Sequence, residues 1–265
     1  MTDKNIPIVI LCGGRGTRLY EETEYKPKPL VEIGGKPILW HIMKGYSHYG
    51  FNNFILCLGY KGKAIKEYFL NYEYMSNDFI LNIKSKEYRQ LNSQAATDTE
   101  DWNIIFADTG KDTNTGGRIK RIEKYIDTDI FFATYGDGIS DINIKKLLDF
   151  HIKHNKIATI TGFHPRSKYG QFKMEKNGHI ISFQEKPKLK DLINGGFFVF
   201  QKEFFKYLGE DCVLEREPFE KTVKDKQMVM YKHEGFWFAV DTYKDYLEIN
   251  AMFNNNFTPW MVWKK

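Results

Sequence analysis

Short apolar runs of strand length alternate with segments of helical periodicity from residue 6 to residue 161 of this chain. The first run, Ile6–Cys12, is continuous and rich in β-branched residues, as expected of a parallel strand that is buried on both faces. Apolar side chains then recur at helical spacing over residues 38–46. Strands that alternate with helices pack in few ways, and the pattern predicts an α/β fold with a doubly wound, mostly parallel, Rossmann-like sheet flanked by helices.

The pattern becomes less regular toward the C-terminus. We expect a single domain, made of a regular half over about residues 1–165 and a less regular part over about residues 166–265. Residues 74–102 are polar and predict an excursion from the sheet, and turn signals at Lys176-Asn177-Gly178 and Asn194-Gly195-Gly196 separate three short strands. The remaining expected strands are 54–58, 103–107, 130–135, 157–161, 171–174, 179–183, 197–200, 228–231 and 236–240, and the remaining helices are 64–72, 117–126, 144–154, 202–208, 215–224 and 243–253.

Composition and charge exclude several classes of protein. Hydrophobic residues make up 42% of the 265 residues, so the chain can bury a sizeable core. The net charge of +5 comes from basic residues that alternate with acids, which predicts solvated faces and no nucleic-acid partner. The longest apolar run is far shorter than the roughly 20 residues that span a membrane, and residues 1–5 lack the apolar core of a signal peptide, so no membrane partner is expected.

The three cysteines, Cys12, Cys57 and Cys212, contain no pair at CxxC spacing. Their odd number and their spacing favour neither a disulfide framework nor a zinc site. Cys12 and Cys57 end apolar runs and are expected to be buried strand residues. Free thiols are typical of a reducing compartment, which predicts a cytoplasmic protein.

A glycine-rich turn follows the first predicted strand, at the edge where ligands bind in sheets of this kind. Glycines let backbone N–H groups approach phosphate oxygens, and arginines add charged, forked donors. A dinucleotide-binding loop needs a third glycine where Leu19 stands, a Walker A loop is absent, and a plain strand-to-helix turn would bind no ligand. The turn therefore predicts a phosphate site and leaves its ligand open. Its residues are Leu11, Cys12, Gly13, Gly14, Arg15, Gly16, Thr17 and Arg18.

A proline-rich segment, Lys26-Pro27-Lys28-Pro29, follows this turn. The two prolines force an extended path, so Lys28 can be held rigidly over the same phosphates at a lower entropic cost than a flexible lysine. The alternative is an exposed turn with solvated lysines. Pro37 is expected in the first turn of the helix over residues 38–46.

Two aspartates that follow predicted strands are candidate metal ligands. Asp137 follows the predicted strand 130–135 and has a glycine on each side, and Asp241 follows the apolar run 236–240. Magnesium prefers one or two carboxylates together with phosphates and water. Taken alone, an aspartate before a helix is more often an N-cap, which is the alternative for Asp241. We assign Asp141 as the N-cap of the helix that follows it.

Polar groups at strand edges and turns are candidate sugar contacts, because sugar binding needs several convergent polar groups on a rigid scaffold. They are Tyr169, Gly170, Glu185, Lys186, Asn194 and Gly195. For the Glu-Lys pair, the alternative is an exposed ion pair beside a turn proline. In the turn 109–118, Thr113 and Arg118 are candidates for contacts with a base or a phosphate, and the alternative is a capping turn with a solvated arginine.

Together these motifs resemble the nucleotidylyltransferase family over residues 8 to about 241. No single segment is specific, whereas their combination is highly specific. The segments are Gly13–Arg18, Lys26–Leu39, Leu39–Lys44, Gly59–Gly62, Asp108–Gly110, Thr115–Arg118, Tyr135–Gly138, Ser182–Pro187 and Asn194–Phe198. Members of this family share a doubly wound sheet and transfer a nucleoside monophosphate to a sugar 1-phosphate.

The resemblance also implies roles for individual residues. Within the family the chain is similar to members that join CTP to glucose 1-phosphate, so these two are the implied substrates, and relatives are often oligomers such as trimers or hexamers. It implies Mg²⁺ as cofactor, held by Asp137 and Asp241. The implied catalytic residues are Arg18, Lys28 and Asp137. The implied nucleotide-binding residues are the turn from Leu11 to Arg18 with Lys28, Thr113, Arg118 and Gly136, and Lys186 would hold the sugar phosphate. Residues 1–165 then form the nucleotide-binding half and residues 166–265 the sugar-binding part.

Three alternatives remain open. A transferase of the same fold would use dTTP, UTP or GTP, or another phosphorylated substrate, although departures from the thymidylyl pattern at 109–118 and at Gly138 favour CTP. A nicotinamide-dependent oxidoreductase is suggested by the incomplete glycine motif alone. A non-catalytic sugar-nucleotide binding protein would not need Lys28, Asp137 and Asp241 together.

Overall fold

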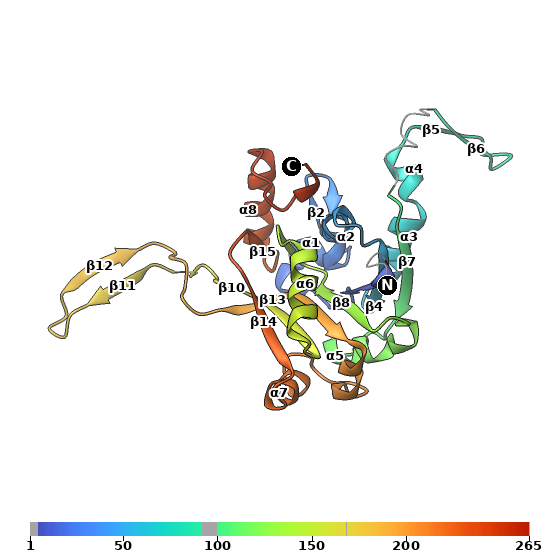
Figure 1. Cartoon of the computed structure of the whole chain (residues 1–265). Coiled ribbons are helices and arrows are strands. Elements are labelled where there is room, and N and C mark those ends of the chain that lie inside the picture. Colours follow the sequence, from blue (N-terminus) through green and yellow to red (C-terminus); the bar gives the residue numbers. More distant parts are fainter. Residues whose placement is uncertain (1–4, 92–99, 168, 265) are drawn as a thin grey trace.

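The computed structural model describes residues 5–91, 100–167 and 169–264, and its centre is a seven-stranded sheet (Figure 1). The strand order is β14-β10-β13-β8-β1-β4-β7. Neighbouring strands are parallel except for β13, which is antiparallel to both β10 and β8. The doubly wound, mostly parallel sheet is thereby confirmed. Its strands are β1 (Ile8–Leu11), β4 (Asn53–Leu58), β7 (Asn103–Asp108), β8 (Ile130–Tyr135), β10 (Ala158–Phe163), β13 (Ile193–Gln201) and β14 (Met228–His233).

Helices cover both faces of this sheet, as the continuous apolar strands predict. Ile8 and Ile10 of β1 pack into one apolar cluster with α2, α6 and α8, whereas Val9 and Leu11 pack into a second cluster with α5 and η6. The α-helices are α1 (Tyr20–Thr23), α2 (Ile38–His48), α3 (Gly62–Leu70), α4 (Tyr72–Ser76), α5 (Thr115–Arg121), α6 (Ile144–His154), α7 (Glu217–Lys224) and α8 (Tyr243–Asn254). The 3₁₀ helices are η2 (Thr17–Leu19), η3 (Lys28–Leu30), η5 (Glu123–Tyr125), η6 (Lys202–Tyr207) and η7 (Val262–Lys264). No described helix has the length and apolar character that crossing a bilayer requires.

The strand register brings three loops to one edge of the sheet. Leu11, the last residue of β1, pairs with Cys57 of β4 on one side and with Tyr135 of β8 on the other. Because all three strands are parallel, the loops that begin at Gly13, Gly59 and Gly136 start side by side. The glycine-rich turn and the Gly136-Asp137 segment are therefore neighbours in space.

A small two-stranded ribbon stands apart from the main sheet. It consists of β9 (Gly138–Ser140) and β15 (Trp237–Ala239), which are antiparallel. Asp137 directly precedes β9, and Asp241 follows β15 by two residues, so one ribbon carries both candidate metal ligands.

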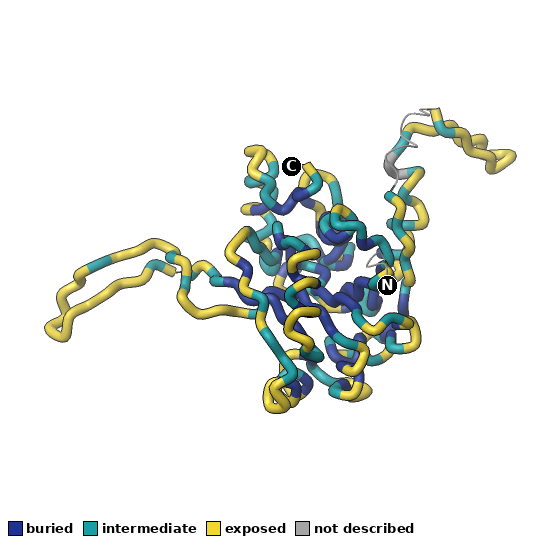
Figure 2. The backbone as a smooth tube through the Cα atoms, viewed as in Figure 1, coloured by how far each residue is buried: buried dark blue, intermediate teal, exposed yellow. Residues whose placement is uncertain are grey.

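Two exposed arms leave the body of the molecule (Figures 1 and 2). One carries β5 (Phe79–Leu81) and β6 (Tyr88–Gln90), and the other carries β11 (Gln171–Met174) and β12 (Ile180–Gln184). The first matches the excursion expected over residues 74–102, of which residues 92–99 lie outside the described part. A further short pair, β2 (Glu32–Ile33) and β3 (Lys36–Pro37), leads into α2.

One expected turn is part of a strand. Asn194-Gly195-Gly196 lies inside β13, where its pairing with β10 shifts register. Gly196 has a φ of +73°, and its N–H donates to the Asn194 side chain at 2.8 Å. The glycines therefore bend a continuous strand instead of ending it, which is a common use of glycine in sheets. The expected helix over 202–208 is the 3₁₀ helix η6.

Candidate active site

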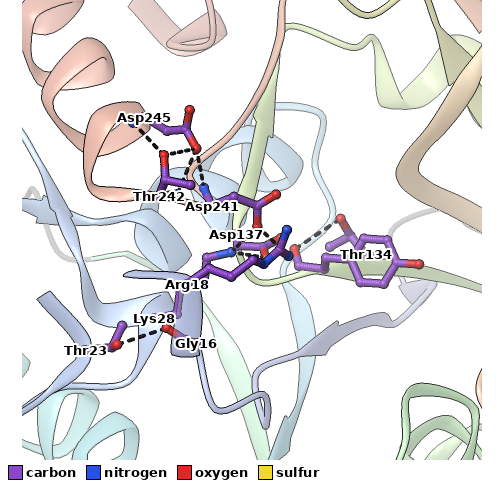
Figure 3. A network of polar contacts seen from close by, with 10 residues as sticks. Gly16, Arg18, Thr23, Lys28, Thr134, Asp137, Asp241, Thr242 and Asp245 are labelled. Carbon is purple, nitrogen blue, oxygen red and sulfur yellow. Dashed lines mark hydrogen bonds and ion pairs between the residues drawn. The ribbon is translucent and has the colours of Figure 1, made fainter. Parts of the chain in front are cut away.

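A lysine lies between the two candidate metal ligands (Figure 3). Lys28 Nζ is 2.6 Å from Asp137 Oδ2 and 2.7 Å from Asp241 Oδ1. Arg18 Nη2 reaches the same Asp241 oxygen at 3.0 Å. The Lys28 side chain is 11% exposed, so the ammonium group is largely shielded from water. Four residues that the sequence marked as catalytic or metal-binding are thus brought together.

Local chain geometry holds Lys28 in place. Pro27 is extended, and Lys28 begins the 3₁₀ helix η3, in which Val31 N–H donates to Lys28 O at 3.0 Å. The next residue, Pro29, is buried. The Lys28 stem passes over Gly16, where a Cβ would lie 3.2 Å from Lys28 Cβ and where φ is +64°. The expectation of a rigid segment that brings a lysine over the glycine-rich turn agrees with this geometry.

The two aspartates are joined through the backbone of the ribbon. Val240 N–H donates to Asp137 O at 3.0 Å, which extends the β9–β15 ladder to the metal-ligand end. Asp241 is not the N-cap of α8, because Thr242 has that role and forms a capping box with Asp245. Asp245 also accepts the backbone N–H of Asp241 at 3.1 Å. The Asp241 carboxylate is therefore directed at Lys28 while its backbone is tied to the start of the helix.

The carboxylates of Asp137 and Asp241 suit a divalent cation that binds together with phosphates. Both direct an oxygen at one point, now held by the Lys28 ammonium. Within the described residues, no group of three or more His, Cys, Asp or Glu forms a complete metal cluster. Two carboxylates completed by substrate oxygens and water are the arrangement that Mg²⁺ prefers.

The glycine-rich turn lies beside this cluster, packed between neighbouring loops. Gly136 N–H donates to Leu11 O at 3.1 Å, and a Cβ on Gly136 would lie 3.1 Å from Pro29 Cγ. Gly14 has open space around it, so its backbone is accessible to a ligand. Arg15 is exposed, and its Nη2 lies 2.5 Å from Asp112 Oδ1. Thr17 belongs to η2, and its side chain lies outside the described part.

Cys12 contributes a buried side chain and a backbone hydrogen bond to this turn, and its thiol carries no charge. Its thiol is buried, and burial raises its pKa well above the ordinary value, so it stays protonated. Its N–H donates to Cys57 O at 3.1 Å, which continues the β1–β4 ladder into the turn.

The Arg118 side chain donates hydrogen bonds to three neighbouring loops. It is 4% exposed, so the alternative of a solvated arginine is wrong. Its Nη1 donates to Leu58 O, Thr109 Oγ1 and Gly110 O at 3.1, 2.9 and 2.7 Å, and its Nη2 donates to Gly13 O at 3.1 Å and Lys111 O at 3.3 Å. Glycine is required at 13 and 59, where a Cβ would lie 2.2 and 2.5 Å from the guanidinium. The guanidinium thus supports the loops, and Thr113 lies beside Gly110 in the same turn.

The predicted sugar contacts divide into two groups. Asn194 and Gly195 lie next to the site: Asn194 Nδ2 donates to Tyr135 OH at 3.3 Å, and Gly195 O accepts from Trp237 Nε1 of the ribbon at 2.8 Å. The other four lie on the β11–β12 arm, which extends away from the sheet (Figure 1). In that group Tyr169, Glu185 and Lys186 are exposed, and Gly170 lies against Glu185, where a Cβ would be 2.9 Å from its Oε2.

Sequence reasoning missed a hydrogen-bond network in which Glu215 joins strand β8 to helix α5. Tyr135, directly before Gly136, donates its hydroxyl to Glu215, whose other oxygen accepts from Thr115 Oγ1 at 2.9 Å. Burial, together with the nearby Glu215 carboxylate, raises the pKa of Tyr135, so the phenol keeps its proton. Glu215 has no local signal, because the contact to Tyr135 spans 80 residues.

Asp141 is not the N-cap of α6. Asn143 has that role, and its side chain accepts from Lys146 N–H. Asp141 Oδ1 instead accepts the Phe236 N–H at 2.7 Å and lies 3.0 Å from His233 Nε2. An aspartate near a helix start is an N-cap candidate on local grounds alone, whereas this partner is 95 residues away.

The family model for nucleotidyl transferases matches residues 8–256. The chain belongs to the nucleotidyl transferase family. It is 47% identical over 257 residues to a probable glucose-1-phosphate cytidylyltransferase of Bacillus subtilis (strain 168), covering 96% of this chain and 99% of that protein. It is 42% identical over 259 residues to the glucose-1-phosphate cytidylyltransferase of Salmonella typhi, covering 97% and 99%.

Solved structures of lower identity share the fold of this nucleotidyl transferase. HddC from Yersinia pseudotuberculosis superposes with a TM-score of 0.66 at 23% identity, covering 94% of this chain and 99% of that chain. UDP-glucose pyrophosphorylase complexed with UDP-glucose gives a TM-score of 0.67 at 18% identity, covering 95% and 99%. These likenesses concern the arrangement of strands and helices.

Proposed function

We propose that this protein transfers CMP from CTP to α-D-glucose 1-phosphate, which yields CDP-glucose and pyrophosphate. The observation that carries this proposal is the 47% and 42% identity, over nearly the whole chain, to two glucose-1-phosphate cytidylyltransferases. The cluster of Lys28, Asp137 and Asp241 beside a glycine-rich turn gives that assignment a chemical basis.

The chemical step is an in-line displacement at the α-phosphorus of CTP. A phosphate oxygen of glucose 1-phosphate forms the new P–O bond, and the bond between the α-phosphorus and the oxygen bridging to the β-phosphorus breaks. The nucleophile is already an anion, so no side chain needs to remove a proton. The protein contributes position and positive charge. In our proposal the N–H groups of Gly13, Gly14 and Gly16, with Arg18, hold the triphosphate, and Lys28 neutralises the α-phosphate.

We propose that Asp137 and Asp241 hold Mg²⁺ together with the nucleotide. When bound, the cation neutralises charge on the nucleotide oxygens. Lys28 Nζ lies at the point where the two carboxylates converge, so a cation held by both would take the place of the ammonium. Lys28 would then be free to approach the α-phosphate, and it would serve as a counter-ion before binding and neutralise the phosphate afterwards.

We propose that the sugar binds next to Tyr135 and the β9–β15 ribbon. Asn194 and Gly195 are joined to the site through Tyr135 and Trp237, which suits contacts to glucose hydroxyls. On the arm, Lys186 supplies a cation for the sugar phosphate, and Glu185 with Tyr169 supplies hydrogen-bonding groups.

We further propose a cytoplasmic homo-oligomer, a trimer or a hexamer. All three cysteines are free thiols, as in a reducing compartment. The β11–β12 arm exposes apolar side chains along one face, where Phe172 pairs with Phe183 and Met174 pairs with Ile180. A two-stranded hairpin is marginally stable alone, so a second copy of the chain would stabilise this arm.

The experiment that tests the reaction measures pyrophosphate release with glucose 1-phosphate and each of CTP, UTP, dTTP and GTP. Coupling to pyrophosphatase and detecting phosphate with malachite green gives one readout for all four. We expect CTP to give the highest kcat/KM. A clear preference for another triphosphate would favour a different transferase of the same fold. No turnover with any of them would favour a transferase for another phosphorylated substrate or a non-catalytic binding protein.

A further inference from the structure

The ribbon that carries both candidate metal ligands is closed at its opposite end by a second polar cluster. The ladder runs from Asp137, whose carbonyl accepts Val240 N–H at 3.0 Å, to Asp141, whose N–H donates to Phe236 O at 3.2 Å. Asp137 and Asp241 thus lie at one end, and Asp141 lies at the other, about 14 Å away by strand geometry.

The far end is tied to the main sheet through a histidine. His233 is the last residue of β14 and pairs with Phe163 of β10. Its Nε2 lies 3.0 Å from Asp141 Oδ1, and both side chains are mostly buried, at 10% and 21% exposure. The same Asp141 oxygen accepts Phe236 N–H at 2.7 Å, so a single carboxylate joins β9, β15 and β14.

The turn between His233 and Phe236 leaves room for the Asp141 carboxylate. A Cβ on Gly235 would lie 2.3 Å from Asp141 Oδ1 and 2.8 Å from His233 Cε1, so only glycine lets the carboxylate reach the turn. Ser140 Oγ donates to Phe236 O at 2.7 Å and accepts Ile142 N–H at 3.2 Å, which closes the same end.

At the metal-ligand end, Val240 N–H donates to Asp137 O and Asp245 accepts Asp241 N–H, so the main chain is held there while Lys28 joins the two side chains. The Lys28 ammonium is the group that bridges Asp137 and Asp241, and two carboxylates without a cation between them repel each other. Separately, Trp237 ties the middle of the ribbon to Gly195. If a cation took the place of Lys28, the spacing of the carboxylates would depend on how firmly the two strands are held along the ribbon.

We propose that Asp141 and His233 are a positioning pair that fixes the β9–β15 ribbon and so sets the separation of Asp137 and Asp241 for cation binding. Neither residue touches substrate. The inference rests on the proposed role of the two aspartates as metal ligands. It assigns a function to a buried Asp–His contact that the transfer step itself does not use.

The test compares His233→Ala, His233→Gln and Asp141→Asn with the wild-type protein. Glutamine can place an amide N–H near the position of His Nε2, so it is the rescue variant. Asp149→Asn, an exposed aspartate on α6, is the matched control. Three quantities are measured: the Mn²⁺ dissociation constant in the presence of CTP by electron paramagnetic resonance of free Mn²⁺, the Tm, and kcat at saturating metal.

We expect His233→Ala and Asp141→Asn to weaken Mn²⁺ binding about tenfold or more, as loss of a group that orients metal ligands does. At saturating metal, kcat should stay within about threefold of wild type, because the pair acts through the carboxylate spacing. His233→Gln should recover most of the affinity, and Asp149→Asn should leave it unchanged.

A lowered Tm with an unchanged Mn²⁺ dissociation constant would overturn the inference, because it would show a purely structural contact. A reduced kcat that saturating metal does not restore would overturn it as well. If wild type binds Mn²⁺ with CTP but forms no CDP-glucose, weaker binding in His233→Ala still supports the pair while the proposed reaction fails. If wild type with CTP binds no Mn²⁺, the pair has no metal site to position, and the inference falls.

Discussion

Lys28 occupies the space between two carboxylates that a divalent cation would also occupy. Its Nζ is within 2.7 Å of an oxygen from each aspartate, and its side chain is 11% exposed. An ammonium and a metal ion cannot both lie at that point. Binding of one would therefore oppose binding of the other, and a nucleotide phosphate that attracted Lys28 would relieve the opposition.

We expect Lys28→Met to bind Mn²⁺ about tenfold more tightly than wild type in the absence of nucleotide, because the competing cation is gone. The same variant should lose about 100-fold or more in kcat at saturating CTP and glucose 1-phosphate, because a charge directed at the α-phosphate is missing. Isothermal titration with Mn²⁺ and the pyrophosphate assay measure the two effects.

Lys26→Met is the matched control for this prediction. Lys26 is 35% exposed and pairs loosely with Glu22 and Glu32, at 3.9 and 3.6 Å. It should change neither quantity by more than about twofold, since exposed ion pairs contribute little. Near wild-type kcat in Lys28→Met would contradict the catalytic role, and unchanged Mn²⁺ affinity would contradict the competition.

Arg118 is a single residue that contributes to the stability of the fold. Arg118→Met would remove the hydrogen bonds from the buried guanidinium to carbonyls of three loops, so we expect the free energy of unfolding to fall by about 3 kcal/mol. Urea denaturation measures this change. The exposed Arg121, which donates to Thr109 O at 2.9 Å, provides the control Arg121→Met, with an expected loss below about 1 kcal/mol. A loss of CTP affinity with unchanged stability would instead indicate a direct ligand contact.

Residue-level sequence rules found some of these groups and missed others for a physical reason. Lys28, Asp137 and Asp241 stand out because prolines or the ends of apolar runs flank them. Asp141 was misassigned because helix capping is read from neighbouring residues, whereas its partner Phe236 is 95 residues away. Arg118 was identified as important, but its burial beneath the loops depends on tertiary packing that no local pattern encodes.

At the scale of elements, two helices carry buried histidines that couple stability to pH. His41 in α2 and His151 in α6 are 3% and 0% exposed, and burial lowers the pKa of each to about 4. An unfolded histidine titrates near 6.5, so between these values the unfolded chain binds more protons than the folded one. Stability is therefore fully present above about pH 6.5 and is lost as the pH falls toward 4.

We expect each of these histidines to remove about 2 kcal/mol of stability between pH 7 and pH 5. Urea denaturation at both values, on wild type and on His151→Gln, measures the effect. The variant should lose correspondingly less on acidification, and His154→Gln, at an exposed position on the same helix, should behave as wild type. A wild-type protein equally stable at both values would refute the coupling.

Strands of the central sheet were predictable where burial on both faces makes them continuously apolar, as in β1, β8 and β10. Glycine and asparagine favour turns, so the sequence predicts a turn at Asn194-Gly195-Gly196, yet the strand continues through it with a shifted register. The β9–β15 ribbon was not foreseen as a unit. Its two strands are short and lie far apart in the sequence, so only their pairing reveals it.

At the scale of the whole molecule, the β11–β12 arm carries the apolar surface through which we propose that copies of the chain associate. Phe172, Met174 and Ile180 on the β11–β12 arm are 61%, 67% and 63% exposed, although apolar side chains of this size are normally covered. Figure 2 shows that the arm is exposed along most of its length.

We expect the triple variant Phe172→Ser, Met174→Ser and Ile180→Ser to lower the mass measured by size-exclusion chromatography with light scattering. The Tm of the central body should change little, because these side chains are outside both apolar clusters. A matched change at polar tip residues, Lys176→Ser and His179→Ser, should leave the mass as in wild type. A wild-type protein that elutes as a monomer would refute the interface on this arm.

The ribbon also determines when this protein can begin to work during its own synthesis. Lys28 leaves the ribosome early, but its partner Asp241 follows it by 213 residues. Because Asp241 follows β15, a nascent chain that has already formed β1, β4 and β8 still lacks one of the two proposed cation ligands. If Asp137 and Asp241 hold the cation, translation must pass residue 241 before the proposed catalytic centre is complete.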